Sequence, residues 1–267
     1  MNVINLAIGA LAGLLAALIA SVLVRDAREN RGRYGATFAI SFAVLFGLAN
    51  VFVYPGLNGR YQAGHVESEL LESPAFRALK QHDRATYDKL VAEMKQSLKD
   101  GKGEGQIIAN VRGHITKVVQ VRLPRASNEA VASYMKVMLV EMDELNQQGG
   151  DLCYRFLFPQ PSGPIDPNKH FSKKTQEADL AALAQVIKSS AEDPQPVPQE
   201  AEVLPTLTPI YLELATEHGE DIAMLQNPTA PSVDRRKICA MSKSIYTKIL
   251  RLPVDDSGRV LRYLLGQ

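Results

Sequence analysis

The chain opens with two long apolar stretches, and the rest of the sequence is interpreted outward from them. Residues 3–24 read VINLAIGALAGLLAALIASVLV, and residues 35–54 read GATFAISFAVLFGLANVFVY. Neither stretch contains an acidic, basic or histidine side chain. Each is about 20 residues long, the length that an α-helix needs to cross a hydrocarbon core of about 30 Å. The two stretches predict a two-helix transmembrane hairpin over residues 1–54.

The segment between the two stretches is basic and predicts the orientation of the hairpin. Residues 25–34 read RDARENRGRY, whereas the tail Met1-Asn2 carries no charged side chain. Lysine and arginine next to membrane helices favour the cytoplasm. The turn is therefore expected inside, with the N-terminus and the large C-terminal part outside, in the periplasm of a bacterial inner membrane. The side chains that set this topology are Arg25, Arg28, Arg31 and Arg33.

A cleaved signal peptide is the alternative interpretation of the first stretch. Such a peptide has a positively charged start and a small-residue cleavage site. Here the start is uncharged, and the apolar run continues directly into the arginine cluster. The pattern favours a retained helix.

Small side chains recur every fourth residue in both stretches. Residues four apart lie on one helix face, and small side chains there let two helices approach closely in lipid. The pattern predicts that the two helices pack on each other, although a partner helix could use the same faces. The residues are Gly9, Gly13, Ala17 and Ser21 in the first stretch, and Gly35, Ala39, Ala43 and Gly47 in the second.

The charge balance and the motif content exclude several classes of function. The chain has 30 basic and 29 acidic side chains, so it lacks the strongly basic character of a nucleic-acid-binding protein. The sequence contains neither a phosphate-binding G-x-x-x-x-G-K-[ST] loop nor a G-x-S-x-G element. No cofactor and no nucleic acid are expected as ligands.

The only two cysteines, Cys153 and Cys239, both fall in the part expected outside the cytoplasm. Neither belongs to a Cys-x-x-Cys motif, and no histidine stands at ligand spacing from them. Two cysteines in an oxidising compartment predict one disulfide. Two buried free thiols are the alternative, because cysteine is among the most buried residue types.

Beyond residue 54 the sequence predicts an all-α extracytoplasmic domain, a helical bundle pinned by Cys153–Cys239. Residues 55–59 are rich in glycine and proline and predict a turn, and residues 151–159 are expected to form an extended, buried connector. A proline-rich linker over residues 193–206 is expected between a helical region at 55–192 and a C-terminal helical region at 207–267 packed on it. Helices are expected over residues 74–81, 84–99, 106–122, 127–147, 172–191, 208–218, 220–225, 233–252 and 258–265, although residues 118–123, rich in β-branched side chains, could equally form a strand. The helix that begins at Ser127 is predicted to turn Val131, Tyr134, Met138, Met142 and Leu145 inward and Glu129, Lys136, Glu141 and Glu144 outward.

Two clusters resemble elements of catalytic sites. Ser133 and Lys136 form S-x-x-K, a spacing that lets an amine take a proton from a hydroxyl, but the companion motifs of serine acyl enzymes are absent. The second cluster combines carboxylates with one histidine and provides the weak metal-ligand candidates Glu217, His218, Glu220 and Asp221, with Glu213 one turn earlier. A solvated acidic helix end is the alternative interpretation of this cluster.

The architecture favours a membrane-anchored periplasmic accessory protein that acts by protein–protein contact and is not an enzyme. Its partners are then the lipid bilayer and another envelope protein, and an immunity-type binder is a narrower version of this hypothesis. Apolar surface for the contact is expected from residues 154–158 and 246–252. The alternative is a periplasmic metal-dependent hydrolase that uses the cluster around His218.

Overall fold

The computed structural model describes residues 8–17, 31–49, 54–159, 163 and 165–266, and every regular element among them is helical. This confirms the all-α prediction for the described part of the chain. The chain divides into two compact units. The first contains the chain up to Leu70 together with Asp88–Arg112, and the second contains Leu71–Tyr87 together with Gly113–Gln267.

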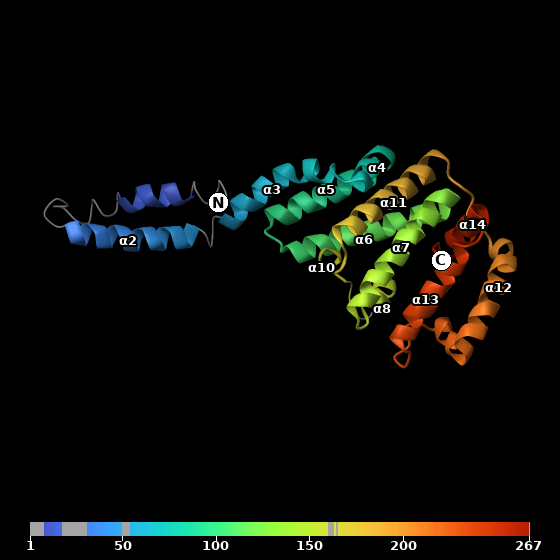
Figure 1. The fold of residues 1–267 in the computed structure, drawn as a ribbon. Coiled ribbons are helices and arrows are strands. Elements are labelled where there is room, and N and C mark those ends of the chain that lie inside the picture. Colours follow the sequence, from blue (N-terminus) through green and yellow to red (C-terminus); the bar gives the residue numbers. More distant parts are fainter. Residues whose placement is uncertain (1–7, 18–30, 50–53, 160–162, 164, 267) are drawn as a thin grey trace. The chain divides into compact units, whose positions relative to one another are not determined.

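The N-terminal part of the first unit is a pair of helices, residues 8–17 and α2 (Arg31–Leu48), drawn in blue in Figure 1. Because α2 begins at Arg31, residues 31–34 of the predicted turn are helical. Arg25 and Arg28 lie outside the described residues. Among the helices that the structure describes, none is both long enough and apolar enough to cross a membrane.

The two helices of this pair meet through glycine on one side and phenylalanine on the other. The place that a Cβ atom would take at Gly9 lies 3.6 Å from Cε2 of Phe46, and the corresponding place at Gly13 lies 3.9 Å from Cε2 of Phe42. The two rings stack, with centroids 5.6 Å apart. Each of these two phenylalanine rings of α2 fills the space next to a glycine of the first helix. The contact is therefore well packed although α2 contributes no small residue at these two points.

The small residues predicted to form the partner face of the second helix lie elsewhere. Ala39, Ala43 and Gly47 are exposed. On the first helix Ala17 is half-buried, while Ala12 and Ala16 are buried. The surroundings of Gly35 and the whole of Ser21 fall outside the description. The pairing is therefore small against aromatic, and the expected pairing of two small-residue stripes is not seen in the described part.

The next segment of the first unit is α3 (Tyr54–Leu70), where the sequence analysis expected a turn over residues 55–59. That prediction is wrong because proline is compatible with the first turn of a helix, and Pro55 is the second residue of α3. Gly59 is required for another reason. A Cβ atom there would collide with the carbonyl oxygen of Leu98 in α5 (Arg84–Lys99), so glycine lets α3 and α5 touch at their backbones.

The second unit is built around α7 (Asn128–Gln148), with α11 packed along one side and α13 and α14 along the other (Figure 1). Outside these, α4 packs on α11, and α12 packs on α13 and α14. The bounds are Pro74–His82 for α4, Glu104–Arg122 for α6, Leu123–Arg125 for η2, Leu152–Leu157 for α8, Pro167–His170 for α10, Lys173–Glu192 for α11, Glu200–His218 for α12, Gly219–Gln226 for η3, Arg235–Ile249 for α13 and Val254–Leu264 for α14. The largest core cluster includes Val131, Met135, Val186, Leu207, Leu214, Ile249, Val260 and Leu261.

Local capping signals fix where the central helices begin. The Ser127 hydroxyl accepts a hydrogen bond from the backbone N–H of Ala130, and the Ser172 hydroxyl accepts one from Thr175. A side-chain oxygen at this position satisfies an N–H group that has no partner within the helix. The predicted starts of α7 and α11 are confirmed.

One predicted element type and one predicted helix start are wrong in the second unit. Residues 151–159 are not extended, because Leu152–Leu157 form the short helix α8, which packs on α7 and α13. The helix expected from residue 208 starts at Glu200 and contains Pro205 and Pro209. Both prolines lie on the exposed side of α12, where water can bond to the carbonyl groups that lose an N–H partner.

The proline-rich segment between α11 and α12 is bound to its surroundings and is shorter than predicted, since it ends at Gln199. The backbone N–H of Gln195 donates to the carbonyl of Arg125 at 2.8 Å. The guanidinium of the buried Arg262 donates to the carbonyl of Pro196 at 2.9 Å. The segment is thus a surface crossing within the second unit.

Gly258 is expected to be essential for the contact between α14 and α7. A Cβ atom there would collide with Cα and Cβ of Asn128, the first residue of α7. Gly258→Ala should therefore destabilise the second unit by about 1–3 kcal/mol, the usual cost of overpacking. Gly113→Ala, in a helical position with open space around it, should instead stabilise by about 0.5–1 kcal/mol. Urea titrations of the full chain in detergent micelles, followed by circular dichroism, measure both. Equal effects of the two substitutions would contradict the backbone contact.

Candidate functional site

The most unusual side chain of α7 is Glu141, which is only 4% exposed. The prediction that it points outward is wrong, because α11 packs along that side of α7. The burial of Glu141 could have been predicted from helical spacing. Glu141 follows Tyr134 by seven residues, or about two turns, and Tyr134 belongs to the predicted inward face. No hydrogen bond joins the Glu141 carboxyl to another group in the described part of the chain. A buried polar group without a partner is rare and suggests a specific role.

Glu141 lines a cavity of about 270 Å³ between α7, α8 and the segment that leads into α11. A second carboxyl group, that of Asp179 in α11, lines the same cavity. The other lining residues are mostly apolar or aromatic: Tyr134, Phe156, Pro167, Phe171, Gln176 and Leu180. The site therefore combines two carboxyl groups with a largely apolar wall, and α7 and α11 each supply one carboxyl.

A separate carboxylate, Glu144, fixes the geometry of this site. It accepts hydrogen bonds from the backbone N–H of Ser172 at 3.0 Å, from the Ser172 hydroxyl at 2.9 Å and from the Thr175 hydroxyl at 2.6 Å. These bonds tie the N-terminus of α11 to α7. The Thr175 hydrogen bond and the two from Ser172 hold the pKa of Glu144 below its ordinary value.

The aromatic wall of the cavity is stabilised by the packing of two phenylalanine rings and by a hydrogen bond from a glutamine side chain. The rings of Phe156 in α8 and Phe171 meet edge to face, with centroids 5.9 Å apart. Nε2 of Gln176 donates to the carbonyl of Phe171 at 3.0 Å, which ties this wall to the first turns of α11. The cavity is thus framed by contacts that do not use Glu141 or Asp179.

Burial raises the pKa of both carboxyl groups, and nearby negative charge raises that of Glu141 further. Burial, together with the charges of Asp179 and Glu144, raises the pKa of Glu141 to about 9. Burial raises the pKa of Asp179 to about 6. The pKa of Tyr134 is also raised, by burial and then by the same two carboxyl groups. Near pH 7 the pair is expected to hold about one proton and one negative charge.

The predicted metal-ligand cluster forms ion pairs with lysines. Lys248 Nζ lies 2.9 Å from Glu213 and 2.7 Å from Glu217, and Lys237 Nζ lies 2.6 Å from Asp221. The hydrogen bond from Lys248 lowers the pKa of Glu217. His218 is adjacent, with Nε2 4.0 Å from Glu217, and Glu220 is exposed. The lysines occupy the carboxylates that the sequence pattern offered to a metal.

The S-x-x-K pair has no catalytic setting. Ser133 and Lys136 are both exposed on α7, whereas the buried face of that helix carries Val131 and Met135. A serine nucleophile needs a base held within hydrogen-bonding reach and shielded from water. The structure provides neither feature at this position.

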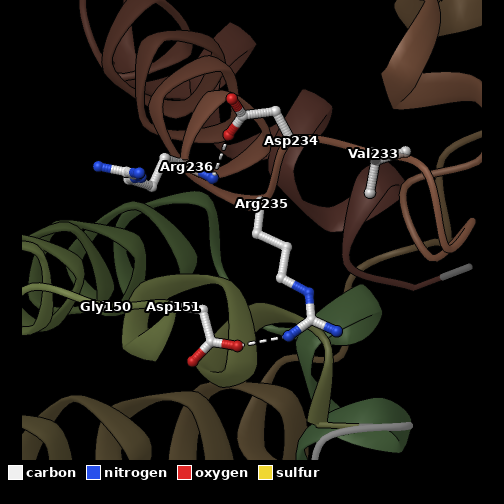
Figure 2. Close-up of a pocket in the computed structure, with 6 residues that line it drawn as sticks. All are labelled: Gly150, Asp151, Val233, Asp234, Arg235 and Arg236. Atoms are coloured by element: carbon white, nitrogen blue, oxygen red, sulfur yellow. Dashed lines mark hydrogen bonds and ion pairs between the residues drawn. The ribbon is translucent and has the colours of Figure 1, made fainter.

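The two cysteines are joined in a disulfide, with Cα atoms 6.0 Å apart, which links α8 to α13. Beside this bridge lies a more open pocket of about 540 Å³ at the start of α13 (Figure 2). Figure 2 shows Arg235 reaching across to Asp151, while Asp234 caps the helix through the backbone N–H of Arg236. The Arg235 guanidinium also lies 5.0 Å from the centre of the Tyr154 ring. These contacts reinforce the junction that the disulfide holds.

Comparison with known proteins gives no family or relative to which a function could be traced. No protein-family model matches the chain, no curated protein matches it, and no solved structure matches its fold.

Proposed function

We propose that this protein is anchored in a bacterial inner membrane by its N-terminal helical pair and acts in the periplasm through contact with another envelope protein. The proposal joins three features. The helical pair has an apolar exterior, the second unit is helical and disulfide-bonded, and the metal-ligand cluster predicted near His218 is occupied by lysines.

The observation that carries the anchor is the distribution of side-chain size in the helical pair. Its interior contains Ala12, Ala16 and the two glycines that face phenylalanine rings. Most of its large aliphatic side chains point outward instead, and Ile8 is the buried exception among the described residues. A water-soluble helix pair buries such side chains, whereas small residues inside and large apolar residues outside are typical of helices in lipid. The outward residues are Leu11, Leu14, Leu15, Ile40, Val44 and Leu48, each 44–69% exposed.

The periplasmic position rests on the arginine-rich turn and on the disulfide. Disulfides persist in the periplasm and are rare in the cytoplasm, where thiols are kept reduced. An arginine-rich turn on the cytoplasmic side leaves the C-terminal part on the opposite side of the membrane. Both arguments support a periplasmic second unit.

Reporter fusions test the anchor and its orientation. A reporter that is active only in the periplasm should be active when fused after Gln267 and inactive when inserted at Gly32. Changing Arg25, Arg28, Arg31 and Arg33 together to glutamine should reduce this difference, because these charges set the orientation. Lys173 and Lys174 changed to glutamine provide a control far from the helical pair in sequence. An active reporter at Gly32 with an inactive one after Gln267 would refute the proposed topology.

The contact surface expected from residues 154–158 and 246–252 is largely half-buried, and two of its residues belong to the core. Tyr154 packs with Ile238 and Met241, and Ile249 belongs to the main core. In the described part of the second unit, the exposed apolar side chains gather instead on α12, where Leu204, Tyr211 and Leu212 are 40–65% exposed. α12 has four glutamates and no lysine or arginine; Glu213 and Glu217 pair with Lys248, so the acidic character that a partner would meet is that of Glu200 and Glu202, near Leu204. This face therefore fits an apolar segment of a partner protein that is flanked by basic side chains.

Site-specific crosslinking in intact cells tests this contact. A photoreactive residue at position 212 or 204 should give one discrete crosslinked product. The same residue at position 177, an exposed position on α11, should give none. Leu204→Glu should abolish the product formed from position 212, because a charge on this face cannot be buried in the contact. Products of similar intensity from positions 177 and 212 would rule out a specific surface on α12.

A further inference from the structure

We propose that the cavity between α7, α8 and α11 is a binding site for a small organic ammonium ion that carries an apolar body. This site goes beyond the proposed anchoring and partner contact and does not depend on either of them.

The charge of the cavity matches such a ligand. Glu141 and Asp179 line it together, and Glu141 is 96% removed from solvent without a hydrogen-bond partner in the described part of the chain. Among the described residues that line the cavity, none is a lysine, arginine or histidine. The charged neighbours that influence the pKa of Glu141 are Asp179 and Glu144, which are both acidic. Those that influence the pKa of Tyr134 are Asp179 and Glu141, which are acidic as well. An ammonium group would supply the missing positive charge and donate hydrogen bonds to both carboxyl groups.

The walls match the rest of the ligand. The apolar part of the cavity wall includes Phe156, Phe171 and Leu180. An ammonium ion near an aromatic ring is also attracted electrostatically by the face of that ring. At about 270 Å³ the cavity lies just below the range of about 300–1,000 Å³ that is common for drug-sized ligands. A single ring or short aliphatic chain that ends in an amine is the size that fits.

A metal ion fits the cavity less well. The part of the chain that the structure describes contains no group of three or more histidine, cysteine or acidic side chains placed to hold a metal. Calcium takes six to eight oxygen ligands, roughly, and magnesium requires near-octahedral geometry. Two carboxyl groups among phenylalanine and leucine side chains do not supply such a shell, whereas they suffice for an organic cation.

Binding of the cation should release protons. An ammonium group beside Glu141 favours the ionised carboxylate, so the proton that Glu141 holds near neutral pH is displaced into solution. A neutral ligand of the same shape has no such effect. Proton release is therefore a signature that separates recognition of the charge from simple filling of an apolar cavity.

Titration calorimetry on the full chain in detergent micelles tests the proposal, with empty micelles as the blank. The probes at pH 7.5 are benzylamine, benzyl alcohol, N-acetyl-lysine methylamide and CaCl₂. Benzylamine should bind with proton release, seen as different heats in buffers of different ionisation enthalpy, and benzyl alcohol should not. Binding of benzylamine alone points to a free amine as the natural ligand, whereas binding of the lysine derivative as well points to a lysine side chain.

The decisive variant is Glu141→Gln/Asp179→Asn, which keeps the shape of the cavity and removes both charges. It should weaken benzylamine binding by about tenfold or more, equivalent to about 1.4 kcal/mol. The matched control Glu129→Gln/Glu177→Gln removes one exposed carboxylate from each of the same two helices and should bind as the original protein does. Circular dichroism verifies that the variants fold. Leu180→Phe, which narrows the apolar end, should also weaken binding while both charges remain.

Three results would overturn the proposal. One is unchanged benzylamine affinity in the double variant. Another is equal binding of benzyl alcohol and benzylamine, or no binding of either amine. The third is calcium binding that is lost in the double variant while benzylamine does not bind, which would make the cavity a metal site.

Discussion

Replacing Cys153 by alanine is expected to lower the free energy of unfolding of the second unit by about 4–5 kcal/mol. The bridge joins residues 86 positions apart, and in the chain-entropy model a loop of this length restricts the unfolded chain by about that amount. Since whole domains are stable by about 5–15 kcal/mol, this loss is a large part of the total. Both cysteines lie in the core, at 4% and 3% exposure, so the substitution also removes buried contacts of the side chain.

Urea titrations of the full chain in detergent micelles, with and without reductant, measure this effect. Reductant should destabilise the original protein by a similar amount and leave Cys153→Ala unchanged. Cys239→Ala should match Cys153→Ala, and the double variant should be little worse than either, because each removes the same bridge. On non-reducing gels of protein alkylated in intact cells, the original chain should migrate faster than after reduction. Two freely alkylated thiols, or a loss below about 1 kcal/mol, would show that the bridge does not stabilise the protein in the cell.

Glu141→Gln is expected to stabilise the second unit at alkaline pH and to flatten the dependence of its stability on pH. The pKa of Glu141 is raised in the folded state, so folding favours the protonated carboxyl. The associated stability is complete below the ordinary pKa of glutamate and is lost as pH rises toward about 9. One such group changes the free energy of unfolding by up to about 1.4 kcal/mol per pH unit. Glutamine resembles the protonated carboxyl, so the variant should be more stable at pH 8 by up to about 5 kcal/mol.

Glu144→Gln is the matched control because it lies one turn away on α7 and should behave oppositely. Its pKa is lowered by hydrogen bonds from Thr175 and Ser172, so its contribution is present above the ordinary pKa of glutamate and is lost as pH falls. Glutamine should weaken these bonds and cost about 1.5–3 kcal/mol at pH 7. Urea titrations at pH 5, 6, 7 and 8 measure both variants. A Glu141→Gln variant that is less stable than the original protein at pH 8 would show that the buried carboxyl has a stabilising partner.

Much of the fold could be predicted from local signals. Ser127 and Ser172 mark the starts of α7 and α11 because N-capping depends on a few adjacent residues. Glycine with a positive φ ends α7 at Gly149, as the sequence indicates. α8 was missed because a helix of one and a half turns, buried among other helices, has no polar face to show its period. The early start of α12 is harder to predict because Pro205 and Pro209 are rare inside a helix, and their tolerance depends on the exposed side on which they lie.

The candidate site depends on tertiary packing and was harder to predict. Glutamate is almost never fully buried without a partner, so the sequence pattern alone favours a solvent-facing Glu141. Its burial follows from α11, which packs on α7 and places Asp179 at the same cavity although it is 38 residues away in sequence. In contrast, the cluster around His218 was visible in sequence but is paired with Lys237 and Lys248, which approach from α13. The closeness of these acidic residues and His218 along the chain suggested a metal site. In the folded protein, lysines from α13 form ion pairs with the carboxylates instead.

The position of the disulfide relative to the segment over residues 193–199 has a consequence for chain integrity. The bridge connects a cysteine before this segment to one after it, and Arg262 holds the segment in place through the carbonyl of Pro196. A protease that cut once in this exposed, proline-rich crossing would convert the protein into a two-chain molecule whose parts remain covalently attached through sulfur. With the proposed N-terminal anchor, the C-terminal fragment would then stay on the membrane without any peptide connection to that anchor. Only a reducing environment would release it, so the survival of a nicked protein at the membrane would report the redox state of its compartment.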